Sequence, residues 1–212
     1  MHYVSVEGLT KSYGIYPLFK GISFNINEGD RIALIARNGV GKSTLLKIMA
    51  GKEHPDAGTC RIHKDVHLVM FEQDPQFDES ATILQNLFQQ DHPVMKAISQ
   101  YEMAMESGEE QAISDAIVEM EERSAWDFES KVNIILTQLN IHHLQQPVAK
   151  LSGGQRKRVS LAKTLIQIGF DPRHIFLLMD EPTNHLDLNM IEWLENYLSQ
   201  EKVTLLLVSH DR

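Results

Sequence analysis

The feature that most constrains this chain is a glycine-rich segment between an apolar run and a stretch with helical spacing. The apolar run covers residues 31–36, and the segment over 36–44 reads Ala-Arg-Asn-Gly-Val-Gly-Lys-Ser-Thr. Helical spacing then continues from Lys42 to Ala50. Glycines let consecutive backbone N–H groups point into one anion-sized hollow, and the dipole of the following helix favours negative charge there. We therefore expect a buried strand, a phosphate-binding loop (P-loop) and a helix.

The side chains of this loop suit a nucleotide and its metal ion. Lys42 can reach the β- and γ-phosphates, and the Ser43 hydroxyl can coordinate Mg²⁺. The other nucleotide contacts expected in the loop are Asn38, Gly39, Gly41 and Thr44. The motif usually begins with glycine, whereas this chain has Ala36. Alanine fits only if its φ is negative, because positive φ costs a residue with a Cβ on the order of 1 kcal/mol.

A second apolar run, at residues 175–179, ends in the acidic pair Asp180 and Glu181. In P-loop proteins an aspartate at a strand end holds the Mg²⁺ shell. Neighbouring residues on a strand point to opposite sides, so Glu181 is free to orient or deprotonate an attacking water. We predict that Asp180 serves the metal ion and that Glu181 is catalytic.

Residues 151–155 read Leu-Ser-Gly-Gly-Gln and precede a helical pattern. Ser152 is suited to cap the helix, and the two glycines expose backbone N–H groups at its start. We predict a second anion-binding helix end that involves Ser152, Gly153, Gly154 and Gln155.

Composition places the chain among ordinary globular proteins. It has 212 residues, of which 42% are hydrophobic and 23% charged, and its net charge is −9. Residues 101–130 contain ten acidic residues and one basic residue, so this segment accounts for the whole excess. The sequence shows no secretory signal and no apolar run that could cross a bilayer. Its single cysteine, Cys60, fits a reducing cytoplasm, where we expect the protein to be.

The order of the patterns predicts an α/β protein with three parts. Residues 1–81 read as strands with one helix and contain the P-loop. Residues 82–150 form the second, helical part, with helical spacing over 82–140 and a hairpin turn at Ser107-Gly108 in the acidic stretch. From 151 to 212, helix and strand alternate, which indicates a parallel sheet with crossover helices.

These motifs together make the chain resemble an ATP-binding-cassette (ABC) ATPase almost from end to end. The resemblance rests on six features in the family's order: Tyr13, the P-loop, Gln73, Leu-Ser-Gly-Gly-Gln, the Asp180-Glu181 strand end and His210. It implies a mixed sheet around the P-loop helix, a β subdomain and an inserted helical subdomain. It also implies that Tyr13 stacks on the adenine of ATP, that Gln73 touches Mg²⁺ and the attacking water, and that His210 contacts the γ-phosphate.

Residues 182–187, Pro-Thr-Asn-His-Leu-Asp, are similar to the form found in ABC-F proteins. That family has two cassettes, no membrane domain and an inserted helical arm, and it is known chiefly for ribosome-associated translation factors. Residues 71–75 and 189–195 are most similar to its Uup-like branch. The resemblance implies that two cassettes sandwich ATP, the second lying in the same full-length chain or in a homodimer. We interpret the 212 residues as most of a first cassette.

Three alternatives remain open at this point. One is an ATP-gated binding module whose hydrolysis only resets it, which differs from the main interpretation in emphasis more than in residues. A nucleotide-binding subunit of an ABC transporter would require a membrane partner, and its loop after Glu181 would usually lack Asn-His. An ABC ATPase that acts on DNA would carry a long coiled coil between the P-loop and Leu151, for which the spacing leaves no room. The ribosome remains the expected partner, although the acidic stretch would meet RNA phosphates poorly.

Overall fold

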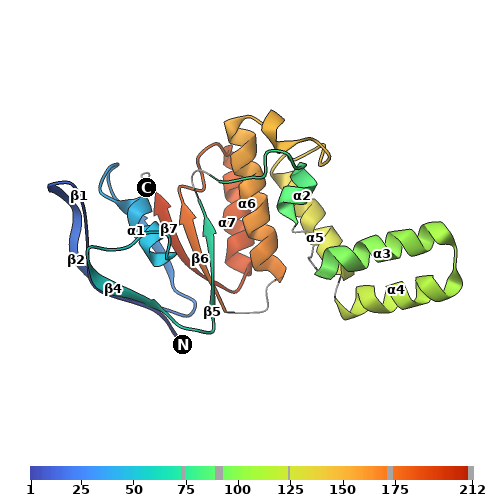
Figure 1. The fold of residues 1–212 in the computed structure, drawn as a ribbon, viewed down its shortest axis with the longest axis horizontal. Helices are drawn as coiled ribbons and strands as arrows, with labels where there is room; N and C mark the ends of the chain where they lie inside the picture. Colours follow the sequence, from blue (N-terminus) through green and yellow to red (C-terminus); the bar gives the residue numbers. More distant parts are fainter. Residues whose placement is uncertain (73–74, 89–92, 124, 171–173, 210–212) are drawn as a thin grey trace. The chain divides into compact units, whose positions relative to one another are not determined.

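The computed structural model describes residues 1–72, 75–88, 93–123, 125–170 and 174–209 (Figure 1). The chain forms two compact units. The first unit combines Met1–Pro75 with Gln167–Arg212, and the second unit is Gln76–Ile166. The P-loop therefore belongs to the first unit, and the Leu-Ser-Gly-Gly-Gln segment belongs to the second.

An antiparallel sheet forms one part of the first unit, with the strand order β2-β1-β4. Its strands are β1 (His2–Tyr13), β2 (Tyr16–Asn27) and β4 (Ala57–Ile62). Apolar side chains alternate along β1, so Val4, Val6 and Leu9 are buried while much of the other face is open. This alternation is typical of an antiparallel sheet that packs one face on a core.

A four-stranded parallel sheet, ordered β3-β7-β6-β5, forms the other part. Its strands are β3 (Arg31–Ile35), β5 (Val66–Phe71), β6 (His174–Asp180) and β7 (Val203–Ser209). Helix α1 (Lys42–Met49) packs on one face, where Leu46 meets Phe176 and Leu206 in a core shared with the antiparallel sheet. Helix α7 (Leu188–Gln200) lies on the opposite face of the parallel sheet (Figure 1).

The second unit is helical. Its helices are α2 (Ile83–Leu87), α3 (Pro93–Ser107), α4 (Glu110–Glu122), α5 (Ala125–Gln138), the short 3-10 helix η1 (Val148–Lys150) and most of α6 (Gly153–Phe170). Helices α3 and α4 form a hairpin that turns at Gly108, whose φ is +69° (Figure 1). Ala97, Met120 and Ala125 form a small core between α3, α4 and α5.

The structure confirms the predicted α/β class, with parallel and antiparallel strands in two sheets. The expectation that residues 31–36 form a buried strand is wrong in one respect. β3 lies at the edge of the parallel sheet, so Arg31, Ala33 and Ile35 are exposed, and only β6 is buried along nearly its whole length. The division into 1–81, 82–150 and 151–212 stays a prediction.

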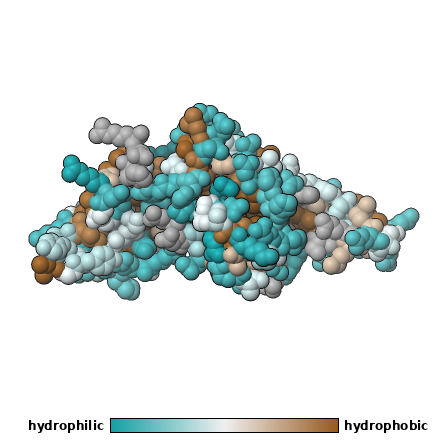
Figure 2. Space-filling view, turned by 90° about the horizontal axis from the view of Figure 1, so that it is seen from above, coloured by the Kyte–Doolittle hydropathy of each residue, from teal (hydrophilic) through white to brown (hydrophobic). Residues whose placement is uncertain are grey.

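No helix in the described part of the chain is long and apolar enough to cross a membrane. On the face drawn in Figure 2, hydrophilic residues predominate and hydrophobic residues are scattered among them.

Candidate functional site

The P-loop connects β3 to α1 and takes its shape from two glycines. Gly39 and Gly41 have φ values of +83° and +91°, which favour glycine. A Cβ on Gly41 would also lie 2.9 Å from the Cβ of Leu18. Ala36 is not among the described residues with positive φ, so alanine fits where the motif usually has glycine.

Lys42 starts α1 and its side chain turns back over the loop. Its ammonium group donates to the carbonyl oxygens of Ala36 at 2.7 Å and of Arg37 at 3.2 Å. The residue is only 8% exposed, so these contacts keep a buried charge hydrogen bonded. The cation is thereby held beside the loop on which a phosphate would bind.

A pocket of about 560 Å³ joins the loop to two other parts of the first unit. Its lining residues are Tyr13, Leu18, Asn38, Gly39, Gly41, Lys42, Ser43, Thr44, Glu181 and Asn184. The structure thus brings together eight of the predicted site residues, from the end of β1, the P-loop with the start of α1, and the loop after β6. Leu18 and Asn184 are lining residues that the sequence analysis missed.

Tyr13 ends β1 and lines this pocket, and two charged residues lie against its side chain. Its hydroxyl donates to the Glu53 carboxylate at 2.6 Å, and the Lys11 ammonium lies 5.6 Å from the ring centroid. The hydrogen bond to Glu53 raises the pKa of the Tyr13 hydroxyl. Tyr13 is nevertheless 55% exposed, so ring surface remains available for stacking on a base.

Asp180 ends β6 and is 3% exposed. Burial raises the pKa of its carboxyl group, and a hydrogen bond with Ser43 opposes that rise. Its other oxygen, Oδ1, is buried without a hydrogen-bond partner among the described residues. A buried carboxylate oxygen beside a serine hydroxyl is a donor set that suits Mg²⁺, so Ser43 and Asp180 fit the expected metal site.

Glu181 leaves the strand with φ of +50°, a strained value for a glutamate. Its backbone N–H donates to the Val208 carbonyl of β7, and its carboxylate accepts a 2.8 Å hydrogen bond from the Asn184 side chain. Glu181 lines the 560 Å³ pocket, which is the candidate nucleotide pocket, while Asp180 is buried at the strand end. A polar amide three residues after the glutamate is the signal that could have pointed to Asn184.

The Leu-Ser-Gly-Gly-Gln segment lies at the start of α6 in the second unit. The Ser152 hydroxyl accepts from the Gln155 N–H at 3.3 Å, and the Gln155 side chain accepts from the Ser152 N–H at 2.9 Å. This reciprocal pair is a capping box. It leaves the N–H groups of Gly153 and Gly154, the first residues of α6, without partners in the preceding helical turn.

Two predicted residues, Gln73 and His210, lie outside the described residues. Their expected contacts with Mg²⁺, the attacking water and the γ-phosphate stay predictions.

Comparison with known proteins places the chain among ATP-binding proteins. The ABC transporter family matches residues 19–184. The ABC transporter ATP-binding protein YfmR of Bacillus subtilis is 41% identical over 100% of this chain and 34% of its own length. The ATP-binding protein Uup of Haemophilus influenzae is 32% identical over 100% of this chain and 33% of its own length.

A more distant relative is the energy-dependent translational throttle protein EttA of Mycobacterium tuberculosis. It is 28% identical over 98% of this chain and 38% of its own length. The chain thus spans about a third of the length of the curated relatives that it matches.

A solved structure, the ATP-binding subunit of an ABC transporter, shares the fold. It has a TM-score of 0.68 at 21% identity and covers 98% of this chain and 79% of its own length. The family matches most of the sequence, and the pocket around the P-loop agrees with an ATP-binding protein. This chain therefore belongs to the ABC transporter family, whose members are ATPases built on an ATP-binding cassette.

Proposed function

We propose that this chain is the ATP-binding and ATP-hydrolysing cassette of a cytoplasmic ABC-F protein that acts on the ribosome. The observation that carries the ATPase part is the 560 Å³ pocket, because Tyr13, residues of the P-loop and Glu181 all line it. A ring for the base, a cradle for phosphates and a carboxylate for the attacking water are the three elements that ATP hydrolysis needs.

ATP binding would start from the loop geometry. The triphosphate would accept from the backbone N–H groups around Gly39 and Gly41, where the dipole of α1 favours negative charge. Lys42, which donates to the Ala36 and Arg37 carbonyls, would give up one or both bonds for phosphate oxygens. Tyr13 would support the base through its ring surface.

Ser43 and Asp180 would hold Mg²⁺, and Gln73 is expected to join them. When bound, the ion neutralises charge on the β- and γ-phosphate oxygens. Ser43 would contribute its hydroxyl oxygen, and Asp180 would contribute its unpartnered Oδ1 directly or through water.

Glu181 would accept a proton from the water while the water oxygen attacks the γ-phosphorus. The bond from the γ-phosphorus to the β–γ bridging oxygen breaks, and ADP and inorganic phosphate leave. Asn184 would hold the Glu181 carboxylate toward the water through the 2.8 Å hydrogen bond. His210 is expected to contact the γ-phosphate.

The Glu181→Gln variant tests this assignment. Because general base catalysis is typically worth about 10²- to 10⁴-fold, kcat for ATP should fall by at least about 100-fold while the Kd for ATP stays within about threefold. Glu195→Gln, on the exposed side of α7, is the matched control and should hydrolyse ATP like the wild type. A Glu181→Gln protein with wild-type turnover would refute the role of Glu181.

A second cassette would complete each nucleotide site. The Ser152–Gln155 segment of one cassette would contact the γ-phosphate of ATP on the P-loop of the other, so ATP holds the two together and hydrolysis releases them. The relatives' length, about three times that of this chain, supports a second cassette in the same polypeptide. A homodimer is the alternative for the 212 residues.

The ribosome is proposed because relatives of this chain include a protein named as a translational throttle. The Asn-His pair at residues 184–185 also matches the ABC-F form, and the second unit contains the α3–α4 hairpin where that family has an arm. The test is co-sedimentation of the full-length Glu181→Gln protein with ribosomes, with the equivalent glutamate of the second cassette also changed.

Pelleting with ATP but not with ADP or without nucleotide would support a translation-linked ATPase. Failure to pellet despite measured ATP binding would overturn the ribosome assignment and leave the ATPase assignment intact. Recovery of a membrane permease in a pull-down would instead favour a transporter subunit, and nucleotide-dependent DNA binding would favour an ATPase that acts on DNA.

A further inference from the structure

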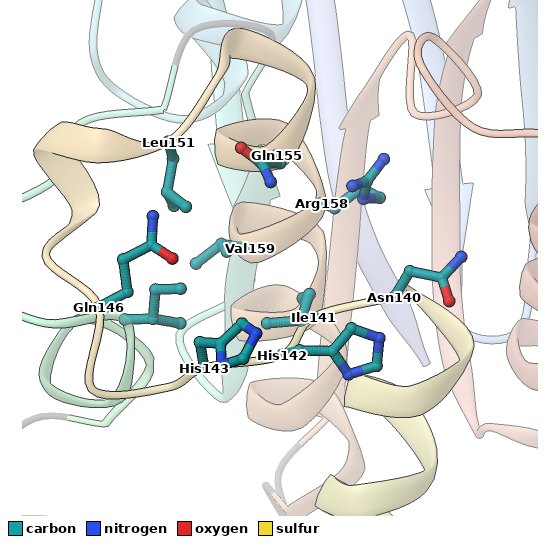
Figure 3. Close-up of a pocket in the computed structure, with 10 residues that line it drawn as sticks. Asn140, Ile141, His142, His143, Gln146, Leu151, Gln155, Arg158 and Val159 are labelled. Carbon is teal, nitrogen blue, oxygen red and sulfur yellow. The ribbon is translucent and has the colours of Figure 1, made fainter.

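A second pocket, of about 110 Å³, lies entirely within the second unit (Figure 3). It is formed by the loop after α5, the start and first turns of α6, and α2. Its lining residues are Ile83, Asn140, Ile141, His142, His143, Gln146, Leu151, Gln155, Arg158 and Val159. None of these residues lines the nucleotide pocket.

The polar side chains of this pocket are donors or can carry positive charge. Arg158 is cationic, and the imidazole rings of His142 and His143 can donate hydrogen bonds, whereas the ten lining residues include no aspartate or glutamate. Asn140, Gln146 and Gln155 add amide groups that can donate hydrogen bonds. Such a set of side chains favours an anionic ligand.

Arg158 carries an unmet requirement for an acceptor. Its Nε is buried and has no hydrogen-bond partner among the residues that the structure describes. Buried polar side-chain atoms are nearly always hydrogen bonded, and a guanidinium group presents its N–H groups in a fork that matches phosphate oxygens. Arg158 therefore has donor capacity that the described residues do not use, and it is one of the residues that line the pocket.

The loop that carries the two histidines is held by backbone hydrogen bonds. Asn140 and His143 adopt left-handed φ values of +49° and +56°. The Ile141 N–H donates to the Leu136 carbonyl at 2.9 Å, and the Gln146 N–H donates to the His143 carbonyl at 2.7 Å. The loop is therefore shaped before any ligand binds, which reduces the entropy cost of binding.

We propose that this pocket is a binding site for a phosphate group, separate from the nucleotide site. The volume admits one small tetrahedral oxyanion, with Arg158 as the main contact and His142 or His143 as a second donor. Two sources share this chemistry: free inorganic phosphate, including that released by hydrolysis, and the phosphodiester of an RNA strand.

A phosphate bound in this pocket would affect the Leu-Ser-Gly-Gly-Gln segment, and this consequence rests on the proposed function. Leu151 and Gln155 belong both to the pocket and to the Leu-Ser-Gly-Gly-Gln segment, and the Gln155 side chain caps Ser152. A phosphate bound to Arg158 would stabilise the first turn of α6 in this capped form, which is the form that we expect to meet the nucleotide of the second cassette.

The experiment is isothermal titration of inorganic phosphate into the protein with its P-loop saturated by AMP-PNP and magnesium, at constant ionic strength. Arg158→Gln should weaken phosphate binding at least tenfold. Lys157→Gln is the matched control, because it removes the same charge from the adjacent position of α6 without touching the pocket. It should bind phosphate like the wild type. If Arg158→Gln does not fold, a His142→Gln, His143→Gln double variant replaces it and should also weaken binding.

A short oligouridylate distinguishes the two sources in a parallel titration. RNA binding that Arg158→Gln removes, with no binding of inorganic phosphate, would assign the site to a phosphodiester. Phosphate binding equal in wild type and Arg158→Gln, or the absence of both ligands from the wild type at millimolar concentration, would overturn the proposal. Loss of ATPase activity in Glu181→Gln is measured separately, so this site and the proposed function can fail independently.

Discussion

The Asn184 side chain donates a 2.8 Å hydrogen bond to the Glu181 carboxylate, and the Asn184 backbone N–H donates to the Glu181 carbonyl at 3.3 Å. The two residues thus lie in one turn, and both line the nucleotide pocket. Glu181 has the backbone φ of +50° in the same turn. The direction of the carboxylate is therefore set by the turn that follows β6 as well as by the strand.

We expect Asn184→Ala to lower kcat for ATP by about tenfold, because losing one hydrogen bond to a charged group costs roughly 1.5 kcal/mol. The Kd for ATP should stay within about twofold, since Asn184 is assigned no contact with the base or with the P-loop. Steady-state kinetics and equilibrium binding separate the two quantities. Asn196→Ala, on the exposed side of α7, is the control. An equal loss of affinity and turnover would contradict a positioning role.

Glu53 is expected to position Tyr13 for the base. Its carboxylate accepts a 2.6 Å hydrogen bond from the Tyr13 hydroxyl and forms a 3.1 Å salt bridge with Lys11. Glu53→Ala should weaken ATP binding about fivefold, the loss expected for a hydrogen bond worth about 1 kcal/mol, and leave kcat at saturating ATP unchanged.

Inorganic tripolyphosphate provides the control for Glu53, because it engages the P-loop but has no base. Its affinity should be the same in the wild type and in Glu53→Ala. In a Tyr13→Ala background, Glu53→Ala should have little further effect on ATP binding. Equal weakening of ATP and tripolyphosphate would show that Glu53 acts on the loop rather than on the ring.

Gly58 is expected to tolerate no side chain. Its φ is +84°, and a Cβ would lie 2.4 Å from the Gly8 carbonyl oxygen and 2.5 Å from that of Glu7, where β4 pairs with β1. Gly29 has a φ of +82° with no atom within 4 Å of such a Cβ, so it isolates the backbone contribution.

In urea denaturation, Gly29→Ala should lower the free energy of unfolding by about 1 kcal/mol, the cost of positive φ. Gly58→Ala should lower it by at least about 2 kcal/mol more, because the crowding atoms belong to the backbone and cannot move aside. Similar losses in the two variants would mean that β4 can shift away from β1.

The stability of the free protein should depend on pH through Asp180. Burial raises the pKa of its carboxyl group, so between the ordinary pKa of about 3.9 and the raised value the folded protein binds more protons than the unfolded chain. The contribution of Asp180 to stability is therefore greatest at low pH and falls as pH rises through that interval.

Asp180→Asn removes this titration. Urea unfolding of the two proteins, measured without metal ion across the interval, should show the wild type losing stability relative to Asp180→Asn as pH rises. Parallel pH profiles would indicate that the Asp180 carboxylate is stabilised in the fold as well as it is in water.

Local sequence patterns predicted much of the fold. The apolar run before Asp180 predicted a buried strand, and β6 is buried from Ile175 onward. The Ser107-Gly108 pair marked the turn between α3 and α4, because glycine reaches the positive φ of +69° that ends the first helix. Apart from that turn, the helical pattern over 82–140 did not show the separate starts of α2, α3 and α5, because the apolar spacing alone does not mark where one helix ends and the next begins.

The P-loop, the acidic strand end and the capped start of α6 were determined by the sequence itself, because each depends on neighbouring residues and on backbone freedom at particular glycines. The tertiary structure decided which distant residues meet. It placed Glu53 against Tyr13, and it left β3 at a sheet edge. It also brought Arg158, His142 and His143 into the lining of one pocket, whose lining residues include no carboxylate. Such contacts join segments far apart in the chain, so they depend on strand order and helix packing, which local periodicity does not encode.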